Sequence, residues 1–446
     1  MALLSPHSTV IARSTTFFVF SRGSGYRDRH LWVHKEGPEG RLRISACLAL
    51  KGPEEGNASP SLSSNESGNF RIMFAAGGTG GHVYPAIAIA DEIKAMHPNA
   101  FIRFVGAKER MEWNAVPSAG FEIVPFPYPA LKHPFFSPQN FFLPFQLLIS
   151  FASSWKILND FSPQIVVGTG GYVSGPLCLV AALRGFKVVI QEQNCQPGLT
   201  NRILSLFATL IFVSFPASVG FFPKSKCVIT GNPVRPSLRR FVSKAVARSH
   251  FFPKAARSAA SAQLVLILGG SLGANAINIA VLNFYLQMLS EHKNRYIIWQ
   301  TGLDAFDEME SLVRGHPRVS LVPYMHRMDM AYAAADLVVS RAVSMTCTEI
   351  LATGKPSILI PSPNAAEDHQ TKNASIMAEI AGSKVLAEDE IDSTTLANVI
   401  EEILGNETLM AEMSEKATKA AMPDASTRIA ERILSLVDLS AGKSSK

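Results

Sequence analysis

A glycine-rich stretch between an apolar run and a helix holds the residues best suited to chemistry. The run Ile72–Ala76 leads into Gly77-Gly78-Thr79-Gly80-Gly81, and His82 stands where a helix is expected to begin, at Val83 or Pro85. Glycines leave backbone N–H groups open to a ligand, and a helix start adds partial positive charge, so the loop suits an anion. An imidazole beside it can take a proton near neutral pH. The stretch predicts a phosphate-binding loop with a candidate base, although tight turns and structural histidines use the same residue types.

The loop lacks the spacing of a dinucleotide-binding motif. With Gly78 and Gly80 as the first pair, the third glycine of G-x-G-x-x-G would fall at Val83. The next apolar run, Phe101–Val105, continues into Gly106-Ala107-Lys108, where no acidic residue is available to hold a ribose. A nicotinamide or flavin cofactor is therefore not predicted.

Short apolar runs alternate with helical segments in two sets, separated by a basic, Phe/Pro/Ala-rich stretch at 237–261. This rhythm predicts parallel sheets covered by helices on both faces. We expect an α/β protein of two Rossmann-like, doubly wound parallel-sheet domains, with ligands bound at the carboxyl ends of the strands in a cleft between them. The expected strands are Ile72–Ala76, Phe101–Val105, Ile165–Gly168, Lys187–Gln191, Leu210–Val213 and Cys227–Thr230, then Leu264–Leu268, Tyr296–Gln300, Val319–Leu321, Leu337–Ser340 and Ser357–Ile360.

The start of the chain differs in composition from the rest. No acidic residue precedes Tyr26, while Ser, Thr and Arg are frequent, which is typical of an organelle transit peptide. Lys51–Asn69 is rich in Ser, Gly, Pro and Glu and predicts a disordered spacer. Import into the chloroplast is our first expectation and import into the mitochondrion the second, with a plain disordered tail as the alternative. The expected divisions are 1–69 for transit peptide and spacer, 70–234 and 235–423 for the two domains, and 424–446 for a helix that packs back on the N-terminal domain and a tail.

Composition excludes several classes of protein. Of 446 residues, 47% are hydrophobic and 17% charged, as in a globular protein. The net charge of +6 includes no block of Lys and Arg, so nucleic acid is not an expected partner. The five cysteines form no CxxC pair, and neither a metal site nor a disulfide framework is indicated. The longest apolar run, Phe141–Ala152, is shorter than the roughly 20 residues that span a bilayer.

Two further glycine loops follow apolar strands in matching places. One is Gly168-Thr169-Gly170-Gly171-Tyr172, and the other is Gly269–Asn275. Three such loops predict several phosphates, and one diphosphate donor with one phosphorylated acceptor would account for them. Arg235, after the turn that Pro233 fixes, offers a planar donor fork for a phosphate or, equally, a cap for a neighbouring carbonyl.

Polar residues near the end of the second set suit a sugar. Glu349 falls near the first turn of a helix after Leu337–Ser340, where it could hold a ribose diol, although helix capping explains it as well. The loop Pro361–Ala374 then brings Asp368, His369 and Gln370 near the same place, and such side chains suit sugar hydroxyls.

Six ordered motifs between about Phe70 and Leu439 together resemble the MurG family of N-acetylglucosamine transferases. They are GGTGGHVYPAIAIA, GTGGYVSGP, QEQN followed by GLTNR, GNPVR, GGSLGA, and RAVSMTCTEI with PSPNAAEDHQTKNA. The resemblance implies a GT-B fold and an inverting hexosyltransferase that moves GlcNAc from UDP-GlcNAc to the muramyl hydroxyl of lipid I, which gives lipid II.

The resemblance also implies roles for individual residues. His82 would be the general base, and Gly170, Gly171 and Tyr172 would face the acceptor's pyrophosphate. Gln370, and His369 beside it, would bind the GlcNAc hydroxyls. The implied contacts to UDP-GlcNAc are Thr79, Gly80, Gly81, Asn194, Arg235, Ser271, Met325, Ser344, Met345, Thr346, Cys347, Thr348, Glu349 and Gln370. No D-x-D pair is present to hold a metal at the diphosphate, so no cofactor is expected, and helix N-termini with Arg235 would stabilise the leaving group.

Aromatic residues gather in one segment of the first domain. Lys and Arg outnumber Asp and Glu between Arg71 and Arg235, which suits an anionic membrane surface. A peripheral membrane contact is expected, with burial of half of these aromatics in the core as the alternative. The segment contains Phe126, Phe135, Phe136, Phe141, Phe142, Phe145 and Trp155, interleaved with Lys132, His133 and Lys156.

Three positions depart from the family pattern. Val343 stands where glycine is usual, Leu272 where glutamine is common, and Gln191 where histidine often precedes EQN. These changes predict weaker donor binding. Val343 and Leu272 favour one alternative, a non-catalytic remnant that binds nucleotide sugar or lipid. The other alternative is a related transferase, a galactolipid synthase of plastids. The motifs GGTGGH, GNPVR and DHQ favour the MurG family over the latter.

Overall fold

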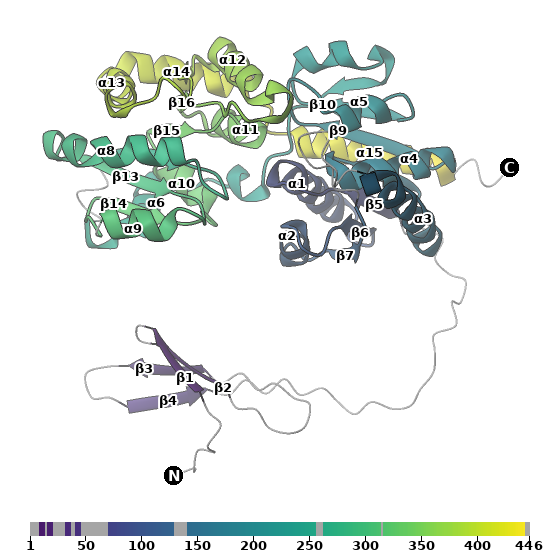
Figure 1. Ribbon diagram of the computed structural model, residues 1–446, viewed down its shortest axis with the longest axis horizontal. Helices are drawn as coiled ribbons and strands as arrows, with labels where there is room; N and C mark the ends of the chain where they lie inside the picture. The colour runs from purple at the N-terminus through teal and green to yellow at the C-terminus, as the bar shows by residue number, and fades with distance from the viewer. Residues whose placement is uncertain are drawn as a thin grey trace. The chain divides into compact units, whose positions relative to one another are not determined.

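The computed structural model describes residues 70–128, 141–255, 262–313 and 315–441, together with four short strands nearer the N-terminus (Figure 1). The chain divides into two compact units, 1–66 and 67–446. In the first unit, β1 (Thr9–Arg13), β2 (Thr16–Phe20), β3 (Trp32–Glu36) and β4 (Arg41–Ser45) form an antiparallel sheet in that order.

These four strands lie in the segment for which the sequence predicts a transit peptide, so ordered elements precede Phe70. The run Thr16–Phe20 combines aromatic and β-branched residues, which favour a strand, and the low content of acidic residues does not oppose one. Residues 51–69, for which the sequence predicts a disordered spacer, lie outside the described residues.

The first sheet of the larger unit has seven parallel strands in the order β11-β10-β9-β8-β5-β6-β7. Alternate residues of its inner strand β5 face opposite sides, with Ile72 and Phe74 in one core and Met73 and Ala75 in the other. Both faces are buried, as the continuous apolar runs predict. The strands are β5 (Arg71–Ala75), β6 (Phe101–Gly106), β7 (Glu122–Pro125), β8 (Ile165–Gly168), β9 (Lys187–Glu192), β10 (Leu210–Val213) and β11 (Cys227–Ile229).

Helices cover this sheet in two layers. On the face of Ile72 lie α1 (Gly80–Met96), α2 (Glu112–Ser118) and α15 (Ala425–Ala441). On the face of Met73 lie α3 (Leu143–Phe161), α4 (Gly171–Leu183) and α5 (Leu199–Leu204). Short 3-10 turns η2 (Pro216–Phe221) and η3 (Lys224–Lys226) precede the last strand.

The second sheet has six parallel strands in the order β14-β13-β12-β15-β16-β17. These are β12 (Gln263–Leu268), β13 (Arg295–Gln300), β14 (Val319–Val322), β15 (Leu337–Ser340), β16 (Ser357–Leu359) and β17 (Lys384–Val385). One face packs on α8 (Asn275–Glu291), α9 (Phe306–Val313) and α13 (Ser393–Leu404). The other packs on α6 (Lys244–Phe251), α10 (Met328–Ala334), α11 (Ser344–Thr353), α12 (His369–Ala381) and α14 (Glu407–Ala420), with 3-10 turns η4 (Pro236–Arg239), η5 (Pro253–Ala255) and η6 (Ala366–Asp368) nearby.

The predicted fold class is confirmed, because the two halves are separate parallel sheets with helices on both faces. Each expected strand is present within one residue at either end. Two strands of these parallel sheets were not expected, β7 and β17. The residues of β7 are only partly buried and include exposed Glu122, so they carry a weak apolar signal. Helix α1 begins at Gly80 rather than at Val83 or Pro85, because Thr79 already accepts the first backbone hydrogen bonds.

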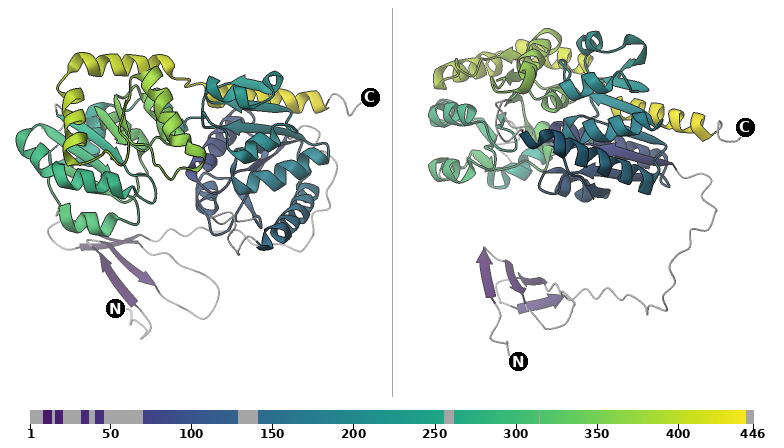
Figure 2. Two further views of the ribbon diagram at one scale, coloured as in Figure 1. Left: turned by 45° about the horizontal axis from the view of Figure 1, so that its top comes forward. Right: turned by 45° about the vertical axis from the view of Figure 1, so that its right-hand side comes forward.

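The last helix returns to the first sheet. Helix α15 follows α14 of the second sheet, yet it packs against α1, and Figure 2 shows it beside the strands of the first sheet. Ile429, Ile433 and Val437, spaced at four residues, are fully buried there. The helix therefore ties the two halves of the unit together.

Replacing Ile433 by alanine should lower the free energy of unfolding by about 2–5 kcal/mol, because the side chain is fully buried and its removal leaves a cavity. Equilibrium unfolding in urea measures the change. Glu431→Ala on the exposed face of the same helix is the control and should stay within about 0.5 kcal/mol of the parent. Equal stability of the two variants would contradict the packing of α15.

Candidate active site

Two glycine loops meet at the carboxyl ends of neighbouring strands. One follows β5 and the other follows β8, and these strands pair directly. A Cβ on Gly171 would lie 2.1 Å from the carbonyl oxygen of Gly77, and the φ angle of Gly171 is 80°. Only glycine fits so close an approach in the left-handed region. The first turn of α1 and the first turn of α4 are thereby brought together.

His82 lies between these loops, half-buried. Its Nδ1 is 2.9 Å from the carbonyl oxygen of Thr169 and 3.2 Å from Oε1 of Gln193. Thr169 in turn donates its hydroxyl to the backbone oxygen of His82 over 2.8 Å. Since a carbonyl only accepts, we assign the proton to Nδ1, which leaves Nε2 as the basic atom. Burial lowers the pKa of His82, so the ring is neutral near pH 7 and Nε2 is ready to accept a proton.

Behind the histidine lies a buried polar network from the QEQN segment. Gln193 donates to the carbonyl of Thr169 over 2.7 Å and to the side chain of Gln191 over 2.6 Å. Burial raises the pKa of Glu192 to about 7, and that carboxyl accepts hydrogen bonds of 2.9 Å from the backbone of Asn194 and from the side chain of Asn201. The network fixes the Thr169 carbonyl and, through it, the ring of His82.

A buried carboxylate that sequence reasoning missed supports the first loop. Glu112, at the start of α2, is fully buried and accepts from the backbone N–H of Gly78 over 3.3 Å and of Ala107 over 3.1 Å. Part of the loop's anion-binding capacity is therefore already used. The N–H groups of Gly80 and Gly81 come before His82, whose N–H makes the first backbone hydrogen bond to Thr79, so they have no partner within α1. In the sequence, Glu112 is indistinguishable from an acid that stabilises a helix start.

The corresponding loop of the second sheet is held by its neighbours. Gln300 donates to the carbonyl of Gly270 over 2.6 Å, and a Cβ on Gly302 would lie 2.1 Å from the backbone nitrogen of Gly273. Ser271 and Leu272 are exposed at the tip of this loop, just before α8 begins. The Leu272 side chain is 67% exposed, so leucine is accommodated there without disturbing the core.

Arg235 and Glu349 form an ion pair rather than lying separately. Nε of Arg235 is 2.9 Å from Oε1 of Glu349, whose other oxygen accepts from the hydroxyl of Tyr332 over 3.1 Å. The guanidinium lies 4.3 Å from the centre of the Tyr84 ring, and Tyr84 shares a hydrogen bond of 2.9 Å with Tyr324. The structure thus places Glu349 beneath Arg235, where it orients the guanidinium. A contact of Glu349 with ribose stays a prediction.

Side chains from both sheets meet through Asn232. Its Nδ2 lies 2.8 Å from Oγ of Ser344, 3.0 Å from Oγ1 of Thr348 and 3.0 Å from the carbonyl oxygen of Gln193. Ser344 also donates to that carbonyl. Two of the predicted donor-binding residues, Ser344 and Thr348, therefore lie where the two sheets face each other.

Asn373 makes a second link of the same kind. Its side chain accepts from the backbone of Cys195 over 3.2 Å and donates to Asn194 over 3.3 Å. Asn194 consequently lies between Glu192 and Asn373, with its side chain held from both sheets. Sequence reasoning missed Asn232 and Asn373, although each stands inside a motif that the resemblance used.

The remaining predicted residues divide by exposure. The side chains of Met325, Met345 and Cys347 are buried in the core, so only their backbone could reach a ligand, whereas Thr346 is partly exposed. Gln370 accepts from the backbone of Ser362 over 2.9 Å at the start of α12, next to His369. Tyr172 is 38% exposed and stacks on Tyr128.

The unusual Val343 is not strained. Its φ and ψ angles are −70° and 133°, an extended conformation that β-branched residues adopt readily. Gln191 is buried and hydrogen-bonded to Asn232 over 3.0 Å. The departures from the family pattern therefore leave the local geometry intact. Within the described ranges no group of three or more His, Cys, Asp or Glu side chains is placed to hold a metal ion.

Comparison with known proteins agrees with this geometry. Residues 72–213 match the N-terminal domain of glycosyltransferase family 28, and residues 264–429 match its C-terminal domain. The UDP-N-acetylglucosamine–N-acetylmuramyl-(pentapeptide) pyrophosphoryl-undecaprenol N-acetylglucosamine transferase of Salinibacter ruber is 41% identical over 367 residues, which cover 82% of this chain and 97% of that protein. The chain belongs to the MurG family. The transferase of the same name from Flavobacterium psychrophilum is also 41% identical, over 83% of this chain and 98% of that protein.

The solved structures extend the likeness to the fold of MurG. The crystal structure of Acinetobacter baumannii MurG superposes with a TM-score of 0.63 at 28% identity and covers 82% of this chain and 99% of that one. A Staphylococcus aureus MnaA–UDP structure, with a TM-score of 0.60 at 13% identity over 83% of this chain and 97% of that one, shares the fold alone. The two halves thus form the paired Rossmann-like domains of a GT-B glycosyltransferase.

Replacing Glu112 by glutamine should destabilise the first loop, because an amide NH₂ would then face the N–H of either Gly78 or Ala107. We expect the free energy of unfolding to fall by about 1–3 kcal/mol and the rate of transfer to fall with it. Thermal unfolding and a transfer assay measure the two effects. Glu122→Gln removes an exposed carboxylate and is the control, with little expected change. Unaltered stability of Glu112→Gln would show that the carboxylate does not hold the loop.

Proposed function

We propose that this MurG-family glycosyltransferase moves GlcNAc from UDP-GlcNAc to the muramyl hydroxyl of lipid I and so produces lipid II. The observation that carries the proposal is the His82 ring, whose Nδ1 is held by Thr169 so that Nε2 is the base between two helix starts. The proposal is further supported by relatives of this activity that are 41% identical across 97–98% of their length.

The reaction follows from the charges around the two loops. The acceptor hydroxyl oxygen attacks the anomeric carbon of GlcNAc from the face opposite UDP, and Nε2 of His82 takes the hydroxyl proton. The bond between that carbon and the diphosphate oxygen breaks, and UDP leaves with the electron pair, so the configuration inverts. We expect the positive Arg235, which is paired with Glu349, and the N–H groups at the starts of α1 and α11 to stabilise the departing charge.

Replacing His82 by alanine should lower kcat at least about 100-fold, because it removes the base, and should leave UDP-GlcNAc affinity nearly unchanged. Transfer of labelled GlcNAc to synthetic lipid I gives the rate, and calorimetry gives the affinity. His250→Ala, at an exposed position on α6, is the matched control and should retain full activity. Full turnover by the His82 variant would remove this residue from the mechanism.

We also propose that the first domain docks on an anionic membrane through α3. The inner face of this helix is buried at Ser150, Ser154 and Leu158, yet its outer face is apolar as well. Phe142, Phe145 and Leu148 are 62%, 63% and 64% exposed. An exposed apolar helix face of this kind suits the interface of a bilayer.

Neighbouring residues add positive charge to this face. Arg184 lies 4.4 Å from the ring centre of Trp155, and Lys156 is exposed beside them. Phe126, in contrast, is 4% exposed and belongs to the core, so it does not join the patch. Lys132, His133, Phe135 and Phe136 lie outside the described residues. No helix in the described part of the chain is long and apolar enough to cross a membrane.

Phe145→Ser should weaken the partition of the protein onto vesicles of anionic phospholipid about tenfold or more. The substitution removes an exposed phenyl ring that would otherwise be buried in the membrane interface. Flotation of the purified protein at low salt measures the bound fraction. Phe241→Ser replaces another exposed phenylalanine, 94% accessible and distant in the sequence, and should leave flotation unchanged. If both variants float to the same extent, or if the parent protein does not float with the vesicles, docking through α3 is contradicted.

Location in the chloroplast is proposed on composition alone. The first 26 residues lack acidic side chains and are rich in Ser, Thr and Arg. A fusion of residues 1–69 to a fluorescent protein tests the proposed location by microscopy. Fluorescence in the chloroplast would support the proposal, and fluorescence in the mitochondrion would contradict it.

A further inference from the structure

A cavity of about 370 Å³ lies beside the glycine loops and is not used by the mechanism above. It is formed at the carboxyl ends of β6 and β7 by two segments, 107–109 and 125–128. Its volume is within the roughly 300–1,000 Å³ that is usual for small-ligand pockets. We propose that this cavity binds the peptide carried by the muramyl sugar of the acceptor. The inference rests on the proposed function and adds a peptide subsite to it.

The cavity is joined structurally to the acceptor loop, which is the glycine loop Gly168–Tyr172 that is expected to face the acceptor's pyrophosphate. Glu112 accepts from both Ala107, in the cavity wall, and Gly78, in the first glycine loop. The rings of Tyr128 and Tyr172 stack with centroids 5.3 Å apart. A Cβ on Gly78 would lie 3.0 Å from the Tyr172 ring, so this ring covers the loop. The cavity and the acceptor loop therefore share a wall.

The distance along the sheet edge suits a peptide. The strand order β8-β5-β6-β7 puts the cavity one to two strands beyond the loop that carries His82. Neighbouring strands are about 4.8 Å apart, so the separation is roughly 5–10 Å. Five extended residues span up to about 17 Å. A pentapeptide attached to a sugar at His82 can therefore reach the cavity and extend through it.

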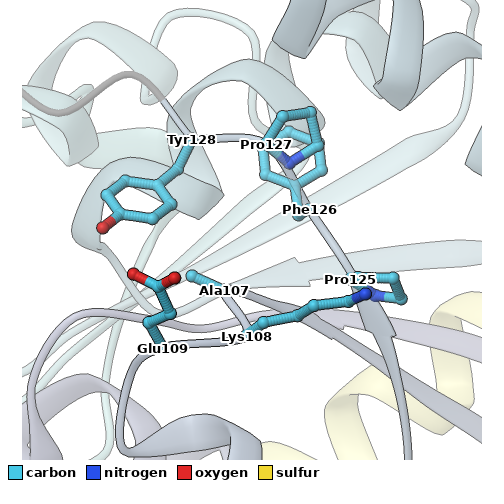
Figure 3. A pocket seen from close by; sticks show the side chains of 7 residues that line it. All are labelled: Ala107, Lys108, Glu109, Pro125, Phe126, Pro127 and Tyr128. Atoms are coloured by element: carbon cyan, nitrogen blue, oxygen red, sulfur yellow. The ribbon is translucent and has the colours of Figure 1, made fainter.

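The lining combines opposite charges with apolar surface. In Figure 3 the side chains of Lys108 and Glu109 lie on one side of the cavity and Tyr128 and Phe126 on the other, with the Glu109 carboxylate directed toward the Tyr128 side. Pro125 and Pro127 complete the apolar wall. An ammonium group suits a peptide carboxylate, a carboxylate suits peptide N–H groups, and prolines suit small alkyl side chains. A prenyl chain would desolvate both charges without pairing them, which disfavours lipid in this place.

Charge reversal at Lys108 tests the subsite. Lys108→Glu should raise the KM for a short-chain lipid I carrying the pentapeptide about tenfold, and leave the KM for the same acceptor without peptide unchanged. Lys224→Glu, at an exposed lysine of the same domain, is the matched control and should alter neither KM. An equal rise of both KM values, or no preference of the parent protein for the peptide-bearing acceptor, would overturn the proposal. So would a Lys108→Glu effect that depends on prenyl chain length.

A binding measurement separates this inference from the proposed function. Calorimetry with soluble N-acetylmuramyl-pentapeptide should show binding to the parent protein that Lys108→Glu weakens about tenfold and Lys224→Glu does not. If transfer fails with both acceptors, the proposed function is wrong, and this measurement still decides the subsite. If all three proteins bind the peptide with equal affinity, or if the parent protein does not bind it, the cavity is not a peptide site.

Discussion

The contact between the two glycine loops of the first sheet positions everything else at the site. Gly171 approaches the carbonyl of Gly77 so closely that no side chain could stand there, and its φ angle of 80° excludes most other residues. This approach brings the Thr169 carbonyl to within 2.9 Å of His82 Nδ1. A backbone acceptor cannot reverse its role, so the tautomer is set by the fold itself. The basic nitrogen is consequently a property of two adjacent parallel strands rather than of the histidine alone.

A small number of hydrogen-bonded residues hold the second sheet in position relative to His82 and its loops. Asn232 contacts Gln193 behind the histidine and Ser344 and Thr348 at the start of α11, and it does so from the segment that links the sheets. Arg235, three residues later, is held by Glu349 on one side and by the Tyr84 ring on the other. The positive groups that would bind a leaving diphosphate are thus fixed relative to the base by side-chain contacts between the two sheets. Helix α15, packed on α1, adds a further connection between the two halves of the unit.

A feature could be predicted from the sequence when neighbouring residues along the chain encode it, and not when it depends on contacts between distant residues. Continuous apolar runs such as Ile165–Gly168 predict buried parallel strands, and the glycine loops that follow them predict anion-binding sites. The fold class and the loops were therefore predictable from the sequence. Strand β7 was missed because its residues are only partly buried, and with it the wall of the cavity at 125–128. Glu112 and Asn232 were missed because their partners are distant in the sequence. A first-turn acid or a loop asparagine looks the same whether it faces water or a buried N–H group.

The role of Glu112 bears on how the first loop handles phosphate. An empty nest of amides would attract any anion, and phosphates are abundant competitors for such a site. Here one carboxylate already satisfies the Gly78 N–H, so the loop keeps its shape without a ligand and offers only the N–H groups at the start of α1. The remaining attraction for a diphosphate then depends on Arg235, which the second sheet orients through Glu349. Strong anion binding therefore requires both sheets in register, and this couples stabilisation of the leaving group to the same geometry that positions the base.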